Sequence, residues 1–217
     1  MSANNLTKSK VAISNLGLVD YLPTWELQKS LAADVITGKS DNTLLLLQHP
    51  SVYTAGRRTE VSDRPQNGTP VVDVDRGGKI TWHGIGQLVG YPIIRLKNPT
   101  DVVGFVREIE GALIDACSEL GISAERVCER SGVWVRDAKG DRKIAAIGIR
   151  VAKGVTTHGF AINVNPDLSA YDQIVPCGIV DAGVTSIANE LGRDIGVDEM
   201  LPLIEKHLIP ALDRVIA

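Results

Sequence analysis

The chain has 217 residues, 44% hydrophobic and 23% charged, the composition of a soluble globular protein long enough to bury a large core. Its formal net charge of −3 leaves no basic surplus to neutralise a duplex, which argues against nucleic acid as a partner. The densest apolar run, TLLLLQ, is too short to cross a bilayer, and the polar start does not read as a signal peptide. We therefore expect a cytoplasmic protein with no membrane partner.

The first elements read as a strand followed by a helix. Residues 11–18 favour a strand, and residues 20–39 favour a helix that ends near Gly38. Apolar residues recur in this helix at i, i+4 spacing: Leu27, Leu31 and Val35.

Short strands follow. Residues 43–49 have the continuous apolar pattern of a buried strand, and residues 60–70, with Pro and Gly, form a loop. Glycines then separate three β-prone runs, which we expect to be hairpin-connected strands of one sheet: 71–75, 79–83 and 87–96.

A long helix is predicted from Asp101, as N-cap, to Gly121. Cys117 on it is expected to belong to the core. The predicted inner face consists of Val102, Phe105, Val106, Ile109, Leu113, Ala116, Cys117 and Leu120.

Three further strands form what the pattern predicts to be a second antiparallel set, with turns at Gly140 and Gly154. Cys128 reads as an ordinary strand position before them. The three runs are 131–137, 142–152 and 154–164.

The last part returns to helix at residues 185–192 and 197–216, the second of which should dock on the sheet. Its apolar face consists of Met200, Leu203, Ile204, Leu208 and Leu212. The element order predicts an α/β protein of the α+β type, with a mixed, largely antiparallel sheet and packed helices. No repeat or linker interrupts the chain, so we expect one domain over 1–217, with residues 1–10 flexible.

A glycine-rich stretch, RGGKITWHGIGQ, covers residues 76–87. It lacks the GxxxxGK[ST] frame of a phosphate loop, and it lacks both the third glycine and the following helix of a dinucleotide fingerprint. Its glycines let the main chain approach a ligand closely or take positive φ, between Arg76 and His83. The alternative is a pair of ordinary hairpin turns.

Cys177 lies in a predicted loop, between a proline and a glycine, and is a candidate nucleophile. The alternative is a buried, inert thiol. A reactive thiol needs a neighbour that lowers its pKa, and Lys143 at the start of an apolar strand is a candidate. The alternative for Lys143 is a solvated side chain beside Lys139 and Arg142.

Three histidines stand near predicted strand ends, where loops gather around sites: His49, His83 and His158. Each is either a partner for the cysteine or a core histidine with satisfied hydrogen bonds. They have no metal-ligand spacing, and the three cysteines have no CxxC spacing, so we expect no metal site and no disulfide framework.

Four motifs in this order and with these gaps resemble the octanoyltransferases of lipoate biosynthesis, also called the lipoate-protein ligase B family: RGGKITWHGIGQLVGYPI, RKIAAIGIRV, THGFAINVNPDL and IVPCGI. The resemblance covers about residues 45 to 190. Two positions depart from it: Lys79 stands where many members have Gln, and Ile85 where Pro is common.

The resemblance implies a fold like that of biotin and lipoate protein ligases. It implies transfer of an octanoyl group from acyl carrier protein to a lysine of a lipoyl domain, through a thioester on Cys177, with Lys143 lowering the thiol's pKa. Matched by motif, the residues that bind the acyl group are Arg76, Gly77, Gly78, Lys79, Ile80, Thr81, Trp82, His83, Ala146, Ile147, Gly148, Gly159, Phe160 and Ala161. His49 and His158 are additional pocket candidates.

This chemistry needs no ATP and no cofactor, because the donor is already a thioester. Lys143 and Cys177 would share one proton, and backbone N–H groups near Gly148 or after Cys177 would bind the oxyanion. The expected acceptors are lipoyl domains of 2-oxoacid dehydrogenase complexes and the glycine cleavage H protein.

Three alternatives stay open at this point: an ATP-dependent lipoate or biotin ligase, a non-catalytic module that holds an acyl group, and a cysteine hydrolase. We expect a monomer, because two protein partners must reach one site. Basic residues that could dock the acidic carrier protein are Arg57, Arg58, Arg64 and the cluster at residues 139–143.

Overall fold

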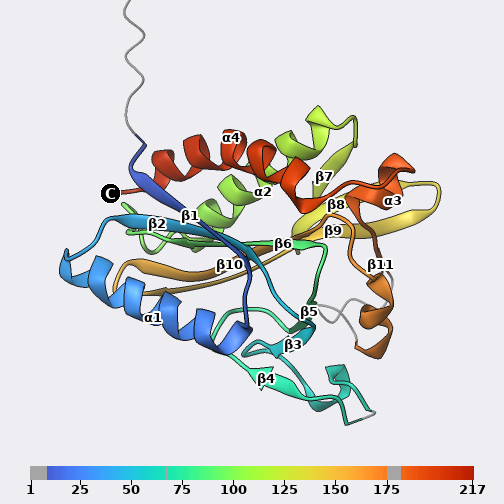
Figure 1. The fold of residues 1–217 in the computed structure, drawn as a ribbon, viewed down its shortest axis with the longest axis horizontal. Coiled ribbons are helices and arrows are strands. Elements are labelled where there is room, and N and C mark those ends of the chain that lie inside the picture. Colours follow the sequence, from blue (N-terminus) through green and yellow to red (C-terminus); the bar gives the residue numbers. More distant parts are fainter. Residues whose placement is uncertain (1–8, 67, 175–181) are drawn as a thin grey trace, which may run out of the picture.

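The computed structural model describes residues 9–66, 68–174 and 182–217. Residues 1–8 of the segment predicted to be flexible, and Cys177, therefore lie outside the described residues. A mixed sheet of eight strands runs through the molecule, with helices on both faces (Figure 1). The predicted fold class is confirmed.

The main path of this sheet has the order β1-β2-β6-β10-β9-β8-β7, and β11 pairs with β9 off the path. Strands β1 and β2 are parallel, as are β9 and β11, and the other pairs are antiparallel. The strands are β1 (Val11–Leu18), β2 (Asn42–Gln48), β6 (Gln87–Ile93), β7 (Ala124–Val127), β8 (Arg130–Asp137), β9 (Gly140–Ala152), β10 (Val155–Asn163) and β11 (Gly183–Val184).

A second sheet of three strands has the order β4-β3-β5, made of β3 (Val52–Ala55), β4 (Val71–Asp73) and β5 (Ile80–His83). The prediction that residues 71–75, 79–83 and 87–96 form one sheet is therefore wrong. The tight turn at Gly84 and Gly86 carries the chain from the small sheet to the large one, where β6 pairs with β2 and β10. Short apolar runs of this kind do not specify their pairing partners.

The strands predicted as a second antiparallel set are β8, β9 and β10. They are antiparallel as expected, but β10 pairs with β6, so they belong to the same large sheet as β1 and β2. Cys128 was expected in a strand and instead lies exposed in the turn between β7 and β8.

One face of the large sheet is covered by α2 (Val102–Glu119), α3 (Ile187–Leu191) and α4 (Val197–Val215). The Asp101 carboxylate accepts a hydrogen bond from the Gly104 N–H and caps α2, as predicted. Cys117 is fully buried, and burial raises the pKa of its thiol to about 12. Within this layer α4 packs chiefly against α2, through Met200, Ile204, Leu208 and Leu212.

The opposite face carries α1 (Tyr21–Thr37) and the small sheet (Figure 1). Gly38, with φ of 72°, ends α1 at the predicted position. Leu27 is exposed, and the helix instead buries Tyr21, Thr24, Gln28, Ala32 and Val35. Gln28 is buried because its side-chain oxygen accepts the backbone N–H of His158 on β10.

Two short 3-10 turns, η1 (Val61–Asp63) and η2 (Leu168–Gln173), complete the elements. Among the described residues, no helix is both long and apolar enough to span a membrane.

Candidate functional site

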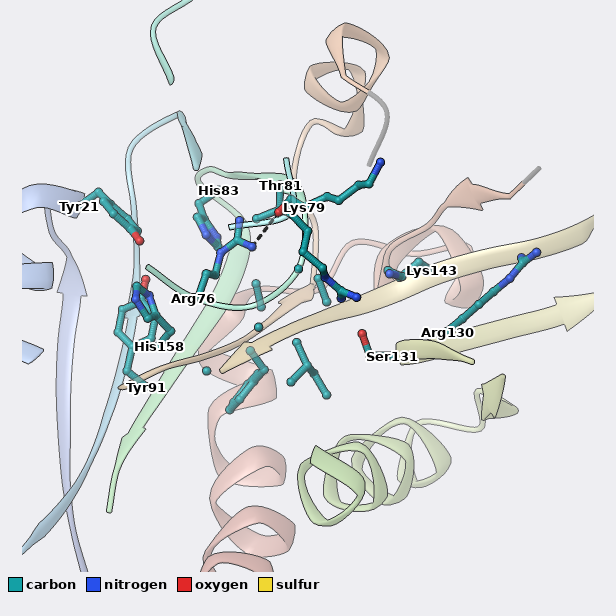
Figure 2. Close-up of a pocket in the computed structure, with 18 of the residues that line it drawn as sticks. Tyr21, Arg76, Lys79, Thr81, His83, Tyr91, Arg130, Ser131, Lys143 and His158 are labelled. Carbon is teal, nitrogen blue, oxygen red and sulfur yellow. Dashed lines mark hydrogen bonds between the residues drawn. The ribbon is translucent and has the colours of Figure 1, made fainter. Parts of the chain in front are cut away.

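A cavity of about 260 Å³ lies between the large sheet and the small one. Strands β9 and β10 form one side, and the other side is the glycine loop, residues 76–79, together with β5 (Figure 2). The lining residues are Tyr21, Arg58, Arg76, Gly78, Lys79, Thr81, His83, Tyr91, Glu129, Arg130, Ser131, Lys143, Ala146, Ile147, Gly148, His158, Gly159, Phe160 and Ala161.

Most of the residues singled out from the sequence meet at this cavity, although they come from three separate motifs. Gly77, Ile80, Trp82 and His49 do not line it. Ile80 and Trp82 alternate along β5 with Thr81 and His83, so they face the opposite way, into a cluster with Tyr53, Tyr171 and Ile174. Gly77 instead donates its N–H to the Ile149 carbonyl, at 3.1 Å.

Glycines allow the loop to lie directly on β9. A Cβ placed on Gly148 would come within 2.9 Å of Arg76 Cδ and 3.3 Å of the Gly77 carbonyl oxygen. Gly78 has φ of 82°, a conformation that favours glycine. Positive φ in this stretch is therefore confirmed, at Gly78 and Gly86, and the main chain lies close to β9; its approach to a ligand stays a prediction. The alternative of two plain hairpin turns is wrong, because β5 pairs with β3 and not with β6.

Arg76 is 7% exposed and braces the loop. Its guanidinium donates to the carbonyl oxygens of Gly77, Lys79 and Thr54, at 3.0, 2.7 and 2.6 Å. The charged end of Arg76 is thus engaged with the main chain, and its stem contacts the cavity beside Gly148.

The two departures from the family pattern fall at the margins of the site. Lys79 Nζ lies 3.1 Å from carboxylate oxygens of Glu60 and Asp63, and these hydrogen bonds raise its pKa. Ile85 is 64% exposed in the turn between β5 and β6 and does not line the cavity.

Lys143 is 7% exposed, which rules out the solvated-lysine alternative. Its ammonium lies over the indole ring of Trp134, 4.6 Å from the ring centroid. Within the part of the chain that the structure describes, no carboxylate pairs with it. The Lys143 side chain is therefore buried, with its amino group against an aromatic face.

A chain of hydrogen bonds fixes the tautomer of His83, and burial keeps the ring neutral. The side-chain nitrogen of Asn163 donates to the Thr185 carbonyl, and Gln87 Nε2 donates to Asn163 Oδ1 at 2.9 Å. Gln87 Oε1 must then accept from His83 Nδ1, at 2.8 Å, so Nδ1 carries the proton and Nε2 is an acceptor. Burial lowers the pKa of His83 to about 3.

His49 lies behind the cavity and orients Tyr91. Its Nδ1 is 2.6 Å from the Val19 carbonyl, which only accepts, so Nδ1 carries the proton. Tyr91 therefore donates its hydroxyl hydrogen to His49 Nε2, at 2.9 Å. Burial lowers the pKa of His49 and raises that of Tyr91 well above its usual value.

His158 has φ of 58°, a conformation that residues other than glycine rarely adopt. Two hydrogen bonds hold it there: its N–H donates to Gln28 Oε1, and its Nε2 donates to Asp75 Oδ1 at 2.7 Å. Asp75 is also paired with Arg150. The histidines are thus buried rings with satisfied hydrogen bonds, one of the two readings that the sequence left open.

Six lining residues were not identified from the sequence as acyl-binding: Tyr21, Arg58, Tyr91, Glu129, Arg130 and Ser131. Tyr91 was inside a recognised motif, but strand alternation alone could not tell which face it occupies. Tyr21 starts a helix remote in sequence, and Glu129, with φ of 63°, lies in a turn whose course the pattern did not indicate.

Of the basic residues considered for docking, Arg64 is paired with Asp73, and Arg142 with Asp137 and Glu190. Arg57 and Arg58 are exposed and have no charged partner among the described residues. Lys139 is also exposed and has no salt bridge among the described residues. Arg58 lies at the cavity, and docking of the carrier protein stays a prediction.

No group of three or more His, Cys, Asp or Glu side chains that could hold a metal is present in residues 9–66, 68–174 and 182–217.

The sheet and the cavity define the class of protein. The structure matches a bi-partite lipoate protein ligase from Thermoplasma acidophilum with a TM-score of 0.67 at 17% identity, covering 94% of this chain and 84% of that one. It matches a biotin protein ligase from Aquifex aeolicus with a TM-score of 0.55 at 17% identity, covering 94% and 71%. At such identities the likeness shows the fold alone, that of lipoate and biotin protein ligases.

Sequence comparison is more specific. Residues 20–209 match the family described as the lipoyl protein ligase A/B catalytic domain. An octanoyltransferase from Salinispora arenicola is 60% identical over 204 residues, covering 93% of this chain and 96% of that protein. One from Rhodococcus opacus is 54% identical over 211 residues, covering 94% and 82%. The chain therefore belongs to the lipoyl protein ligase A/B catalytic-domain family and, within it, groups with the octanoyltransferases; it is an acyltransferase.

Proposed function

We propose that this chain transfers an octanoyl group from octanoyl-acyl carrier protein to the ε-amine of one lysine on lipoyl domains, through a thioester on Cys177. Octanoyltransferase relatives of 54–60% identity support the octanoyl group, and the buried Lys143, which lines the cavity and has no carboxylate partner among the described residues, supports the mechanism. The acceptors are the lipoyl domains of 2-oxoacid dehydrogenase complexes and the glycine cleavage H protein.

The chain on either side of Cys177 supports its role as the nucleophile. The described chain stops at Ile174, which packs with Trp82 of β5, and resumes before β11. Val184 of β11 pairs with Lys143, and the Thr185 N–H donates to the Lys143 carbonyl at 3.0 Å. The described residues on either side of the cysteine segment therefore lie against strands that line the cavity, β5 before the segment and β9 after it.

In the first half-reaction the Cys177 thiolate attacks the donor carbonyl. A carbon–sulfur bond to Cys177 forms, the bond to the carrier thiol breaks, and Lys143 gives that thiol its proton. One thioester replaces another, so the free energy changes little and no ATP is required. Backbone N–H groups near Gly148 are candidate donors to the oxyanion, each worth about 3 kcal/mol if well aimed.

In the second half-reaction the acceptor amine attacks the acyl-cysteine, and Cys177 leaves as the thiolate. The acceptor lysine has a reference pKa of about 10.4 and must lose a proton to act. The acceptor loses this first proton to water; Lys143, neutral after the first step, takes the second proton, which the nitrogen releases as the amide forms, and returns to its starting state. Both protein partners need the same opening, so we expect a monomer acting in the cytoplasm.

Intact-mass analysis after incubation with octanoyl-acyl carrier protein tests the proposal. We expect an octanoyl adduct on the wild type and on Cys128→Ser, the matched control at an exposed cysteine, and no stable thioester adduct on Cys177→Ser. Lys143→Ala should slow both half-reactions and shift the alkylation of Cys177 to higher pH. A fully active Cys177→Ser, or transfer that requires ATP and releases pyrophosphate, would overturn the proposal.

A further inference from the structure

The cavity has one open end and one closed end. Arg58, Glu129 and Ser131 border the open end and are exposed. In Figure 2, Lys143 and Ser131 lie at one end of the lining, and Tyr21, Tyr91 and His158 lie at the other. An acyl chain whose carbonyl stays beside Lys143 must therefore extend toward the rings, methyl group first.

The closed end is a wall of buried aromatic side chains, Tyr21, His83 and Tyr91, which are 5%, 7% and 3% exposed. Tyr21 and His83 stack with their planes 14° apart and their centroids 6.0 Å apart. His49, fully buried, lies behind them, 5.1 Å from Tyr21 and 5.9 Å from His83 between ring centroids. We call the three lining rings the end wall.

Hydrogen bonds to residues behind the end wall hold Tyr91 and His83 in place. Tyr91 projects from β6, a central strand, and its hydroxyl is bonded to His49, which is bonded in turn to the Val19 carbonyl. His83 is fixed through Gln87. Tyr91 and His83 cannot move aside without breaking these hydrogen bonds, and Tyr21 packs against His49 and His83, so the depth of the cavity is fixed.

We infer that the end wall sets the length of the acyl chain that this enzyme transfers, with Tyr91 as the main determinant. The inference rests on the proposed function, because it takes the thioester carbonyl to lie beside Lys143. A chain two carbons too long meets the end wall and displaces its carbonyl from Lys143, whereas one two carbons too short leaves apolar lining uncovered.

Transfer from acyl carrier protein loaded with hexanoyl, octanoyl, decanoyl or dodecanoyl groups tests this inference, with acylation of a lipoyl domain followed by mass spectrometry. We expect the wild type to prefer octanoyl. Tyr91→Ala should raise the ratio of decanoyl to octanoyl kcat/KM at least about tenfold, since one methylene in an apolar pocket is worth that much or more. Tyr91→Phe, which keeps the ring and loses only the hydroxyl, should keep the octanoyl preference.

A second variant covers the case in which Tyr91→Ala does not fold. Tyr21→Ala shortens the end wall from α1, at the first residue of the helix, and should shift the preference toward longer chains as well. Unchanged preference for octanoyl in active Tyr91→Ala or Tyr21→Ala, or a shift in Tyr91→Phe equal to that in Tyr91→Ala, would overturn the inference. A wild type that transfers no acyl group would instead count against the proposed function.

Discussion

At the scale of single residues, two rings of the end wall, His83 and Tyr91, are neutral and have polar atoms that are hydrogen-bonded to residues behind them. His83 donates a hydrogen bond to Gln87, and the Tyr91 hydroxyl donates one to His49. An octanoyl chain there meets no charge and no unsatisfied donor from these groups. The physical reason is desolvation, which favours the uncharged form of each buried side chain.

This arrangement predicts a dependence of stability on pH. Burial lowers the pKa of His83 to about 3, whereas in the unfolded chain it is about 6.5, so below pH 6.5 the unfolded state binds a proton that the native state does not. The contribution of neutral His83 to the free energy of unfolding is complete above pH 6.5. It decreases by about 1.4 kcal/mol per pH unit as the pH falls toward 3. Urea unfolding at pH 7, 6 and 5 measures it.

The matched variant is His83→Asn, whose side-chain nitrogen can still donate to Gln87. Its free energy of unfolding should fall less steeply below pH 6.5 than that of the wild type, by about 1.4 kcal/mol per pH unit. Equal slopes for the two proteins would show that His83 takes up its proton in the native state.

At the scale of elements, the glycine loop lies on β9 because Gly148 presents no side chain. Replacing it with alanine forces the loop outward, since the added methyl group meets Arg76 Cδ at 2.9 Å. Gly148→Ala should lower the free energy of unfolding by about 1–3 kcal/mol, the range for overpacked sites. It should also slow octanoyl transfer, because the displaced loop forms one side of the cavity.

Gly111→Ala is the control for this prediction. Gly111 lies inside α2, where an added methyl group meets only the end of the flexible Arg126 side chain, at 2.9 Å. Alanine in a helix interior stabilises by about 0.5–1 kcal/mol relative to glycine. Urea unfolding and transfer rates should therefore separate the two variants, and equal behaviour would contradict the packing argument.

At the scale of the whole molecule, one buried carboxylate connects the helical layer to the cavity. Glu110 of α2 is fully buried, accepts the Gly132 N–H at 2.9 Å, and pairs with Arg107 and Arg126 at 2.6 and 3.2 Å. Gly132 in turn lies close to Lys143, because a Cβ on it would be 3.4 Å from Lys143 Cε. Glu110 thus positions the strand that borders the open end of the cavity.

Glu110→Ala should lower the free energy of unfolding by about 2 kcal/mol, because the buried Gly132 N–H loses its acceptor. Glu110→Gln keeps an acceptor oxygen and should lose less. Octanoyl transfer should fall in the same order, measured in single-turnover assays with urea unfolding in parallel. If Glu110→Ala is fully folded and transfers octanoyl at the wild-type rate, the helical layer does not position the strand beside the open end of the cavity.

The sequence by itself determined most of the local structure. Asp101 and Gly38 marked helix ends through capping and positive φ, and apolar periodicity identified the core face of α2. The order of four motifs was sufficient to indicate the family, and three of these motifs supply most of the cavity lining.

Only the tertiary structure decided which strands pair and which side chains close the cavity. The pairing of β10 with β6 and the separate sheet of β5 depend on contacts between residues about 70 positions apart or on turns that change sheets, which local patterns do not encode. Tyr21 and Tyr91 come together from α1 and β6 for the same reason. The end wall is a property of packing between distant elements, so no stretch of the sequence predicts it.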